Sequence, residues 1–213
     1  MKRDLEVLYA SLQQKTGISG FDEVLNGGIP KYSLILLSGT SGSGKTILSF
    51  QWLFNGAKQG ENGLYISITE PLFMAVRNIE SMKFYDRKII EQEKIKLFDI
   101  KEDLDYEKIE PHSILSYIEQ KVKETNAKRI VIDSITAILY ALNDQSKIAH
   151  FLFELKKILA TLGCTTILIS KVTDATKYSS YSILELIPDG VFSLTNTVGE
   201  NQIVKKLQVI KMR

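Results

Sequence analysis

Apolar residues along this chain gather in five short runs, separated by longer stretches of mixed apolar and charged character. Short apolar runs bounded by turn residues indicate buried strands, whereas apolar residues spaced by three or four indicate helices. The runs predict strands at about 33–37, 64–68, 94–100, 129–134 and 164–170. The stretches between them predict helices that end near residue 58 and span about 72–82, 112–124 and 145–162. Buried strands alternating with helices are typical of a parallel sheet covered on both faces, so we expect an α/β fold.

The two ends of the chain depart from this alternation. Residues 4–14 place Leu5, Leu8 and Leu12 at helical spacing, which predicts a short amphipathic helix that packs on the domain or serves as a partner-binding arm. Near the other end, 190–196 and 204–212 alternate like antiparallel strands at one edge of the sheet. We therefore expect an N-terminal helix within 1–15, followed by a single α/β domain over 16–213.

The segment "SGTSGSGKT", residues 38–46, lies between the first strand and the helix that follows it. It matches the phosphate-loop pattern G-x-x-x-x-G-K-[ST]. In such a loop, backbone N–H groups and the helix N-terminus hold phosphates, and glycines let the backbone approach them closely. The lysine reaches the β and γ phosphates, and the threonine hydroxyl binds Mg²⁺. We expect a nucleoside triphosphate to be bound by Gly39, Thr40, Ser41, Gly42, Ser43, Gly44, Lys45 and Thr46.

A carboxylate follows the fourth predicted strand. The stretch "RIVIDS" ends its apolar run at Asp133, and side chains at the carboxyl ends of parallel strands line the ligand crevice. A carboxylate in that place typically holds the metal ion of a bound nucleotide. Asp133 is also a suitable N-cap for the next helix. We expect Thr46 and Asp133 to be the metal-site residues, with the capping role as the alternative.

Composition and charge narrow the class of protein. The 213 residues are 44% hydrophobic with a net charge of +2, as expected of a soluble globular protein without a global nucleic-acid-binding field. A single cysteine, Cys164, cannot form an internal disulfide and favours a reducing compartment. The charged first residues lack the apolar core of a signal peptide, and no window approaches about 18 uncharged apolar residues. We expect a cytoplasmic protein with no membrane contact.

Three stretches carry a resemblance to a known family: "TGISGFDEVLNGGIPKYSLILLSGTSGSGKT", "GENGLYISITEP" and "RIVIDSITAI". From Thr16 to Arg213 the chain resembles the KaiC-like branch of the RecA superfamily of ATPases, in its single-domain archaeal form. The stretch "GFDEVLNGGIP" and the chain length select this branch. The resemblance implies a RecA-like P-loop NTPase fold, ATP and Mg²⁺ as ligands, and a homo-oligomer such as a hexameric ring or RecA-like assembly. RadA and its paralogues share this fold and act in DNA recombination.

The resemblance also bears on the catalytic base. RecA-like ATPases place a glutamate at the end of the second strand to polarise the attacking water, and KaiC-like members usually place two adjacent glutamates there. This chain reads Thr69-Glu70. Glu70 matches the second glutamate, and we expect it to be the general base. Successive strand residues face opposite ways, so hydrolysis would be poor if the position of Thr69 is the catalytic one.

Three further residues are assigned by the resemblance alone. Ser170, at the end of the fifth strand, matches a polar residue that senses the γ-phosphate, or is an ordinary strand-end hydroxyl. Lys211 and Arg213 match a Lys-x-Arg pair that reaches a neighbouring subunit's γ-phosphate and takes part in catalysis there with Lys45. A solvated basic C-terminus is the other reading of this pair.

Three functions are compatible with these residues. The first is a slowly hydrolysing ATPase that couples nucleotide state to oligomer contacts and to signalling through a protein partner. The second is a RadA-paralogue-like accessory factor that binds DNA through residues 170–182, where Lys171, Lys177, Tyr178 and Tyr181 would contact phosphates and bases; a mobile surface loop explains these four residues as well. The third is an ATP-binding module with little turnover, as Thr69 suggests.

Overall fold

The structure is a computed structural model that describes residues 11–104, 110–173, 178–179, 181–198 and 202–213. Its centre is a seven-stranded sheet in the order β5-β4-β6-β7-β3-β8-β9. Six of these strands run parallel, and β9 pairs antiparallel with β8 at one edge. The strands are β3 (Leu34–Gly39), β4 (Gly63–Ser67), β5 (Ile95–Asp99), β6 (Arg129–Asp133), β7 (Thr165–Lys171), β8 (Gly190–Val198) and β9 (Ile203–Met212). The predicted mainly parallel α/β sheet with an antiparallel C-terminal edge is confirmed.

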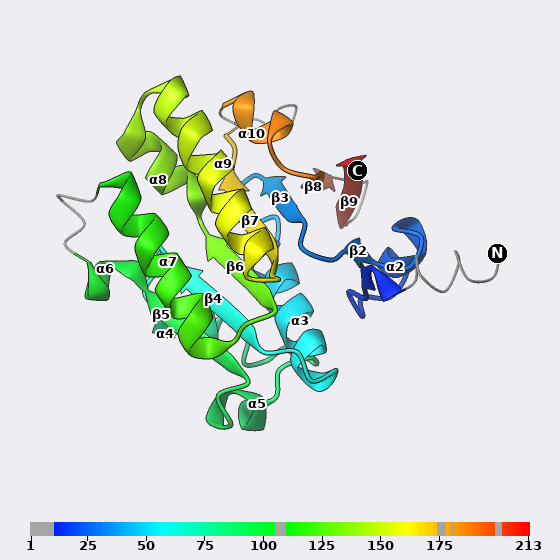
Figure 1. Ribbon diagram of the computed structural model, residues 1–213. Helices are drawn as coiled ribbons and strands as arrows, with labels where there is room; N and C mark the ends of the chain where they lie inside the picture. The colour runs from blue at the N-terminus through cyan, green and yellow to red at the C-terminus, as the bar shows by residue number, and fades with distance from the viewer. Residues whose placement is uncertain (1–10, 105–109, 174–177, 180, 199–201) are drawn as a thin grey trace, which may run out of the picture.

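Helices cover both faces of this sheet (Figure 1). The helices are α2 (Phe21–Val24), α3 (Lys45–Lys58), α4 (Leu72–Arg77), α5 (Arg87–Glu91), α6 (Ile100–Asp103), α7 (Pro111–Thr125), α8 (Ile135–Leu142), α9 (Gln145–Thr161) and α10 (Ile183–Leu186). The long helices begin and end close to their predicted bounds. The helix predicted over 72–82 is shorter, because the chain turns after Arg77 and continues through hydrogen-bonded turns to Tyr85.

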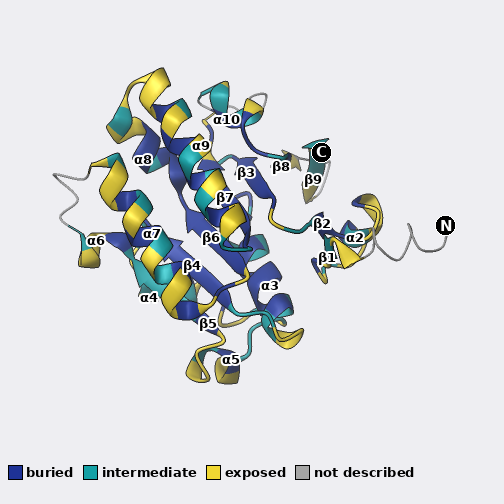
Figure 2. Cartoon of the chain, in the orientation of Figure 1, coloured by how far each residue is buried: buried dark blue, intermediate teal, exposed yellow. Residues whose placement is uncertain are grey.

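Strand alternation divides the core into two layers. Leu34 and Leu36 of β3 pack with residues of α7, α8 and α9 on one face, whereas Ile35 and Leu37 pack with residues of α3 on the other. Strands β3 to β8 contribute to both layers in this way, because successive side chains point to opposite faces, whereas the apolar residues of β9 that pack against the core lie in the layer that contains α3. Figure 2 shows the central strands buried and the outer surfaces of α7 and α9 exposed, whereas the edge strand β9 is partly exposed. Residue parity along a strand therefore decides which layer a side chain enters.

The N-terminal segment differs from the predicted helix. Residues 1–10 lie outside the described part of the chain, so most of the predicted helix is not described. Its last residues form β1 (Gln13–Gln14), which pairs antiparallel with β2 (Ile29–Pro30). The backbone here bonds across the pair, with Lys31 N–H donating to the Leu12 carbonyl at 2.8 Å. Leu12 is 49% exposed, so the helical spacing of the leucines does not place Leu12 in the core.

A buried arginine joins this segment to the domain. Arg129, at the start of β6, is fully buried and forms an ion pair with Glu61. Its guanidinium also donates to the carbonyls of Trp52 at 2.9 Å and Lys15 at 2.8 Å. Burial of a charge is costly unless it is paired and hydrogen-bonded, and here each guanidinium nitrogen of Arg129 has a partner. The sequence alone gives no sign of this arrangement, since an arginine at the start of a strand is ordinarily exposed.

We expect Gly56→Ala to destabilise the protein, although Gly→Ala within a helix normally stabilises by about 1 kcal/mol. A Cβ at Gly56 would collide with the Arg129 side chain, which its hydrogen bonds hold in place. Overpacking of this kind costs about 1–3 kcal/mol. Urea denaturation measures the effect. In an Arg129→Ala background the same substitution should no longer destabilise; equal stability of Gly56→Ala and the parent would contradict the expectation.

Candidate nucleotide site

The phosphate loop connects β3 to α3, as its sequence predicts. Two of its glycines are required by the backbone. A Cβ at Gly39 would collide with the Leu194 carbonyl of β8 and lie 2.8 Å from Ser43 Oγ. Gly44 is the N-cap of α3 with φ of 105°, a conformation that favours glycine. The loop therefore lies tightly against β8 and directs the N-terminus of α3 toward the carboxyl end of the sheet.

Lys45 is held inside this loop. Its ammonium donates to the carbonyls of Gly39 and Thr40, each at 2.7 Å. Burial lowers the pKa of Lys45 to about 8; the Asp133 carboxylate opposes this shift, and the charge of Lys171 adds to it. A bound phosphate would favour the charged form, since a nearby opposite charge raises the pKa of a lysine.

We expect ATP binding to take up a proton when it is measured at about pH 9. Above its pKa of about 8 the Lys45 amine is largely neutral in the free protein, and a neighbouring polyphosphate should return it to the ammonium form. ATP affinity should therefore fall as pH rises through 8, by at most about tenfold per pH unit. Calorimetry in two buffers of different ionisation enthalpy measures the uptake. Equal heats in both buffers at about pH 9 would contradict it.

The metal-site residues are brought together by a shared hydrogen bond. Thr46 Oγ1 donates to Asp133 Oδ2 at 2.7 Å, although the two residues lie far apart in sequence. Tyr65 of β4 donates its hydroxyl to the same oxygen at 3.0 Å. Burial and the Asp133 carboxylate raise the pKa of Tyr65, so its hydroxyl remains a donor. Asp133 is thus oriented from two sides.

This donor set fits Mg²⁺. Mg²⁺ prefers hard oxygen ligands and usually binds through one or two protein groups together with waters and substrate phosphates. Thr46 and Asp133 supply a hydroxyl and a carboxylate at the phosphate loop. No cluster of three or more His, Cys, Asp or Glu residues suited to a metal ion occurs among the described residues. A metal ion here would therefore depend on a bound nucleotide for its remaining ligands.

A cavity of about 390 Å³ opens beside the loop. Lys45, Thr46, Asp133 and Glu70 all line it, so the structure brings the predicted base to the predicted phosphate and metal residues. Glu70 Oε1 accepts a hydrogen bond from Asn78 at 3.3 Å, and Asn78 lines the cavity too. Thr69 lies instead on a separate cavity. Of the two adjacent residues, Glu70 is the one that faces the phosphate loop.

Ser170 does not line this cavity. Ile169 and Lys171, its neighbours on β7, both line it. Ser170 points to the opposite layer, where its buried hydroxyl lies 3.4 Å from Thr136 Oγ1. The physical reason is strand alternation, which gives adjacent residues opposite faces. The structure therefore does not bring Ser170 to this cavity, and the end of β7 reaches the cavity through Lys171.

Lys211 and Arg213 lie far from their own phosphate loop. Lys211 pairs with Val191, at the level of Leu36 in the middle of β3. Its ammonium donates to three carbonyls at the end of α10, those of Glu185 (2.9 Å), Leu186 (3.0 Å) and Pro188 (2.6 Å). Burial and then the charge of Arg213 lower the pKa of Lys211. Any contact of this pair with a γ-phosphate would have to be with a second subunit.

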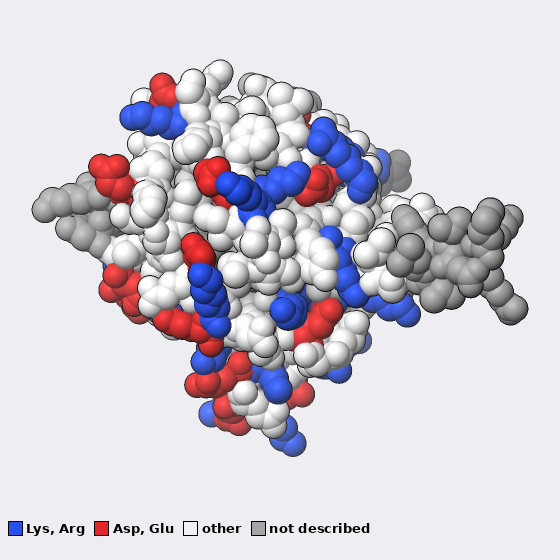
Figure 3. Space-filling view, in the orientation of Figure 1, with Lys and Arg blue, Asp and Glu red and all other residues white. Residues whose placement is uncertain are grey.

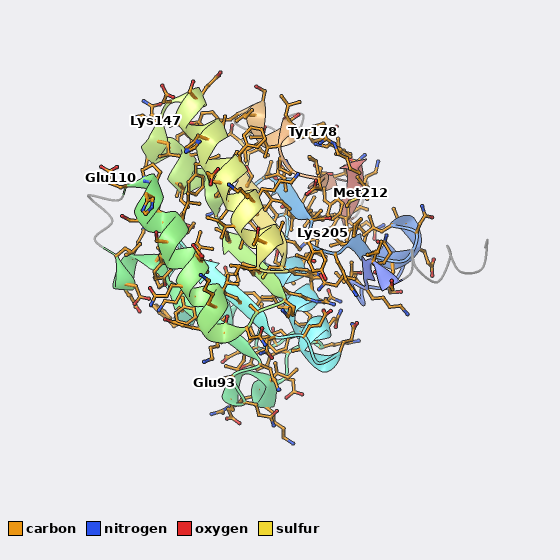
Figure 4. All side chains as sticks on the ribbon, in the orientation of Figure 1. Glu93, Glu110, Lys147, Tyr178, Lys205 and Met212 are labelled. Carbon is orange, nitrogen blue, oxygen red and sulfur yellow. The ribbon has the colours of Figure 1, made fainter. Side chains whose placement is uncertain are left out.

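Lys205 lies at the opposite end of β9 and was not expected at the site. Its ammonium lies 3.4 Å from the position that a Cβ on Gly44 would take, and the residue lines the cavity. Figure 4 labels Lys205 and Met212, which mark the two parts of β9. Six residues separate Lys205 from Lys211, which is roughly 20 Å along a strand. The direction of the last strand could have identified Lys205, because an antiparallel last strand begins at the end of the sheet where the phosphate loop lies.

The segment considered for DNA contact is described only in part. Residues 174–177 and 180, with Lys177 among them, lie outside the described residues. Tyr178 and Tyr181 are partly buried and pack against the core, and Lys171 faces the nucleotide cavity. In the view of Figure 3, positive and negative side chains are interspersed. Contact with DNA remains a prediction.

The phosphate loop follows one parallel strand, a carboxylate ends another, and one strand lies between these two. This arrangement defines a P-loop ATPase of RecA-like fold. The family model "ATPase: KaiC" matches residues 14–213, and the chain belongs to the KaiC ATPase family. No helix among the described residues is long and apolar enough to span a membrane.

Individual relatives agree with this assignment. A UPF0273 protein of Pyrococcus horikoshii is 33% identical over 210 residues, covering 93% of this chain and 84% of that protein. The circadian clock oscillator protein KaiC of Prochlorococcus marinus is 32% identical, with 93% of this chain matched to 40% of that longer protein. The crystal structure of a KaiC-like protein from Pyrococcus horikoshii is 34% identical, with a TM-score of 0.80 over 94% of this chain and 88% of that chain.

Proposed function

We propose that this protein binds Mg·ATP, hydrolyses it slowly, and uses its nucleotide state to change contacts between copies of itself and thereby signal to a protein partner. The observation that carries the proposal is the single cavity lined by Lys45, Thr46, Asp133 and Glu70. These residues supply a phosphate-binding cation, two metal-binding oxygens and a carboxylate base. Membership of the KaiC ATPase family supports the same chemistry.

Each residue has a role in the proposed reaction. The loop N–H groups and the Lys45 ammonium bind the β and γ phosphates and stabilise the charge that develops during phosphoryl transfer. Thr46 and Asp133 hold Mg²⁺, which would neutralise phosphate charge when bound. Glu70 accepts a proton from the attacking water, and Asn78 holds the Glu70 carboxylate in place. Tyr65 orients Asp133.

The coupling between subunits rests on β8 and β9. Lys205 at one end of β9 lies at the phosphate loop of its own chain. Lys211 and Arg213 lie at the other end, where they would address the γ-phosphate of a neighbour. A nucleotide bound at one site therefore contacts the same strand that would complete the next site. This arrangement supports a homo-oligomer whose contacts respond to the nucleotide.

We expect Lys45→Ala to abolish Mg·ATP binding or weaken it at least about tenfold, because the Lys45 ammonium is held within the loop by the Gly39 and Thr40 carbonyls and the variant loses its charge-assisted hydrogen bonds to phosphate. Isothermal titration calorimetry measures the affinity. Lys58→Ala is the matched control, since Lys58 ends the same helix away from the cavity. Parent-like affinity in Lys45→Ala would refute the site.

A further inference from the structure

Tyr65 lies behind the metal-site residues rather than in the nucleotide cavity. It is a fully buried residue of β4, and the described residues that line the cavity do not include it. Its hydroxyl donates to Asp133 Oδ2, the same oxygen that accepts a hydrogen bond from Thr46. Any effect of Tyr65 on a bound metal ion would therefore pass through the Asp133 carboxylate.

The sheet fixes the backbone of Tyr65 relative to that of Asp133. β4 and β6 are neighbouring parallel strands, and Tyr65 is in register with Val131. Asp133 lies two residues beyond Val131, so its side chain points to the same face of the sheet. Ser67 is in register with Asp133, and the Ile68 N–H donates to the Asp133 carbonyl at 2.7 Å. Backbone pairing therefore holds the two side chains at a fixed spacing.

The ring of Tyr65 is held by the helix that follows the phosphate loop. Phe50 of α3 stacks on it, with ring centroids 4.3 Å apart and 23° between the ring planes. Phe50 is fully buried and lies about one helical turn after Thr46. Tyr65 thus links the helix that carries Thr46 to the strand that ends in Asp133, by stacking on one side and by a hydrogen bond on the other.

A carboxylate held in this way suits a metal ion with strict geometry. Mg²⁺ requires near-ideal octahedral coordination at short metal–oxygen distances, whereas the larger Ca²⁺ accepts variable geometry. Two donors on one oxygen, from Thr46 and from Tyr65, restrict the rotation of the Asp133 carboxylate. Without the Tyr65 hydroxyl, Asp133 would keep one of these two bonds and could turn toward positions that suit a larger ion.

We propose that Tyr65 is a positioning residue that makes the metal site selective for Mg²⁺ over Ca²⁺. The inference rests on the proposed function, since it assumes a nucleotide-bound metal ion at Thr46 and Asp133. It adds to that function a determinant of metal choice that lies outside the cavity. Removal of a partner that orients a metal ligand typically lowers metal affinity by about 10–100-fold.

Tyr65→Phe tests this role, because it removes the hydroxyl and keeps the ring that stacks on Phe50. Calorimetry with a non-hydrolysable ATP analogue in EDTA, in saturating Mg²⁺ and in saturating Ca²⁺ gives the contribution of each metal ion to nucleotide affinity. The parent should gain more affinity from Mg²⁺ than from Ca²⁺. In Tyr65→Phe the Mg²⁺ contribution should fall about tenfold or more, and the Ca²⁺ contribution by less than about threefold. Affinity in EDTA should stay within about twofold of the parent, since Tyr65 does not line the cavity.

Two further variants separate this role from a general loss of packing. Tyr117→Phe is the matched control, because the Tyr117 hydroxyl also donates to a carboxylate, Asp103 Oδ2 at 2.8 Å, and neither residue lines the nucleotide cavity. It should leave both metal contributions unchanged. Phe50→Leu keeps the Tyr65 hydroxyl but loosens the ring, so the Mg²⁺ contribution should fall by a smaller factor than in Tyr65→Phe. Phe50→Leu also carries the test if Tyr65→Phe does not fold.

The other outcomes separate this inference from the proposed function. An unchanged Mg²⁺ contribution in Tyr65→Phe, equal losses for Mg²⁺ and Ca²⁺, or a parent that gains equally from both ions would overturn the role of Tyr65 in metal choice and leave the proposed function intact. A loss in EDTA as large as the loss in Mg²⁺ would also overturn it, since the change would then lie in the phosphate loop. A parent whose nucleotide affinity no metal ion raises would overturn the proposed metal site and this inference together.

Discussion

Glu70→Gln is expected to lower the rate of ATP hydrolysis about 100-fold or more, while the affinity for Mg·ATP stays within about twofold of the parent. Glutamine keeps the size and hydrogen-bonding shape of the side chain but cannot accept a proton from water. Glu70 and Asp133 are the carboxylates that line the cavity, and Asp133 is engaged by Thr46 and Tyr65. Single-turnover hydrolysis, measured beside equilibrium binding of ATP, separates the chemical step from affinity.

Two control variants sharpen this experiment. Thr69→Ala should hydrolyse ATP like the parent, because Thr69 lies on a separate cavity from Lys45. Asn78→Ala should lower the rate by a smaller factor than Glu70→Gln, since it removes only the hydrogen bond that holds the carboxylate. Unchanged turnover in Glu70→Gln would place the base elsewhere. A parent that binds ATP without measurable turnover would establish the binding-module alternative.

The sequence is sufficient for the sheet and for the phosphate loop because both depend on local patterns. The apolar runs at β3, β4, β6 and β7 are buried on both faces, so most of their residues are apolar or small, and the charged residues Arg129, Asp133 and Lys171 stand at strand ends. The loop pattern supplies glycine where its own backbone requires it, as the φ of 105° at Gly44 shows. In both cases, the residues whose pattern allows the prediction are the same residues that form the strand or the loop.

Face assignment at the strand ends could not be predicted in the same way. Whether Thr69 or Glu70 faces the phosphate loop depends on where β4 ends, and it ends at Ser67. A shift of one residue reverses the outcome at such a position. The same parity separates Ser170 from Lys171 at the end of β7. Pairwise registers with neighbouring strands decide these cases, and they involve residues distant in sequence.

Tertiary contacts account for the other differences. The amphipathic pattern at residues 4–14 favours a helix, but Gln13 and Gln14 pair with β2 in the folded chain. Arg129 reads as an ordinary charged residue and is fully buried, because Glu61 and two carbonyls surround it. The residues that pair with Gln13 and Gln14, and those that surround Arg129, are distant in sequence and form no local pattern with them. Long-range hydrogen bonds therefore override local propensity at these two places.

The C-terminal cations illustrate a different limit, since their predicted role lies outside a single chain. Lys211 is bound to the three carbonyls at the end of α10, so contact with a neighbour's phosphate would require those bonds to break. The guanidinium of Arg213 has no ion pair within the described part of the chain, and its residue is exposed. The Arg213 backbone N–H donates to the Asp189 carbonyl at 3.0 Å. Arg213 is therefore the better candidate for a residue that acts in trans.

Arg213→Ala is expected to lower ATP turnover about 1,000-fold or more without altering the fold, by analogy with arginine fingers. Lys45→Ala, which lacks a working phosphate loop, should be equally inactive. A mixture of the two should recover activity, because an Arg213→Ala subunit keeps its loop and a Lys45→Ala neighbour supplies the arginine. Random assembly from equal amounts makes about a quarter of the sites complete. Steady-state ATPase assays of the mixture measure this recovery.

The control for this experiment is co-assembly itself. Differently labelled variants should exchange subunits, as energy transfer between the labels would show, and activity should rise with the same time course. A second mixture uses Lys45→Ala with the double variant Lys45→Ala/Arg213→Ala, in which no subunit has an intact loop, and it should stay inactive. A first mixture that co-assembles yet remains inactive would show that Arg213 does not act across the interface. The C-terminal cations would then serve only the fold, with Lys211 capping α10 and Arg213 bonded to Asp189 through its backbone.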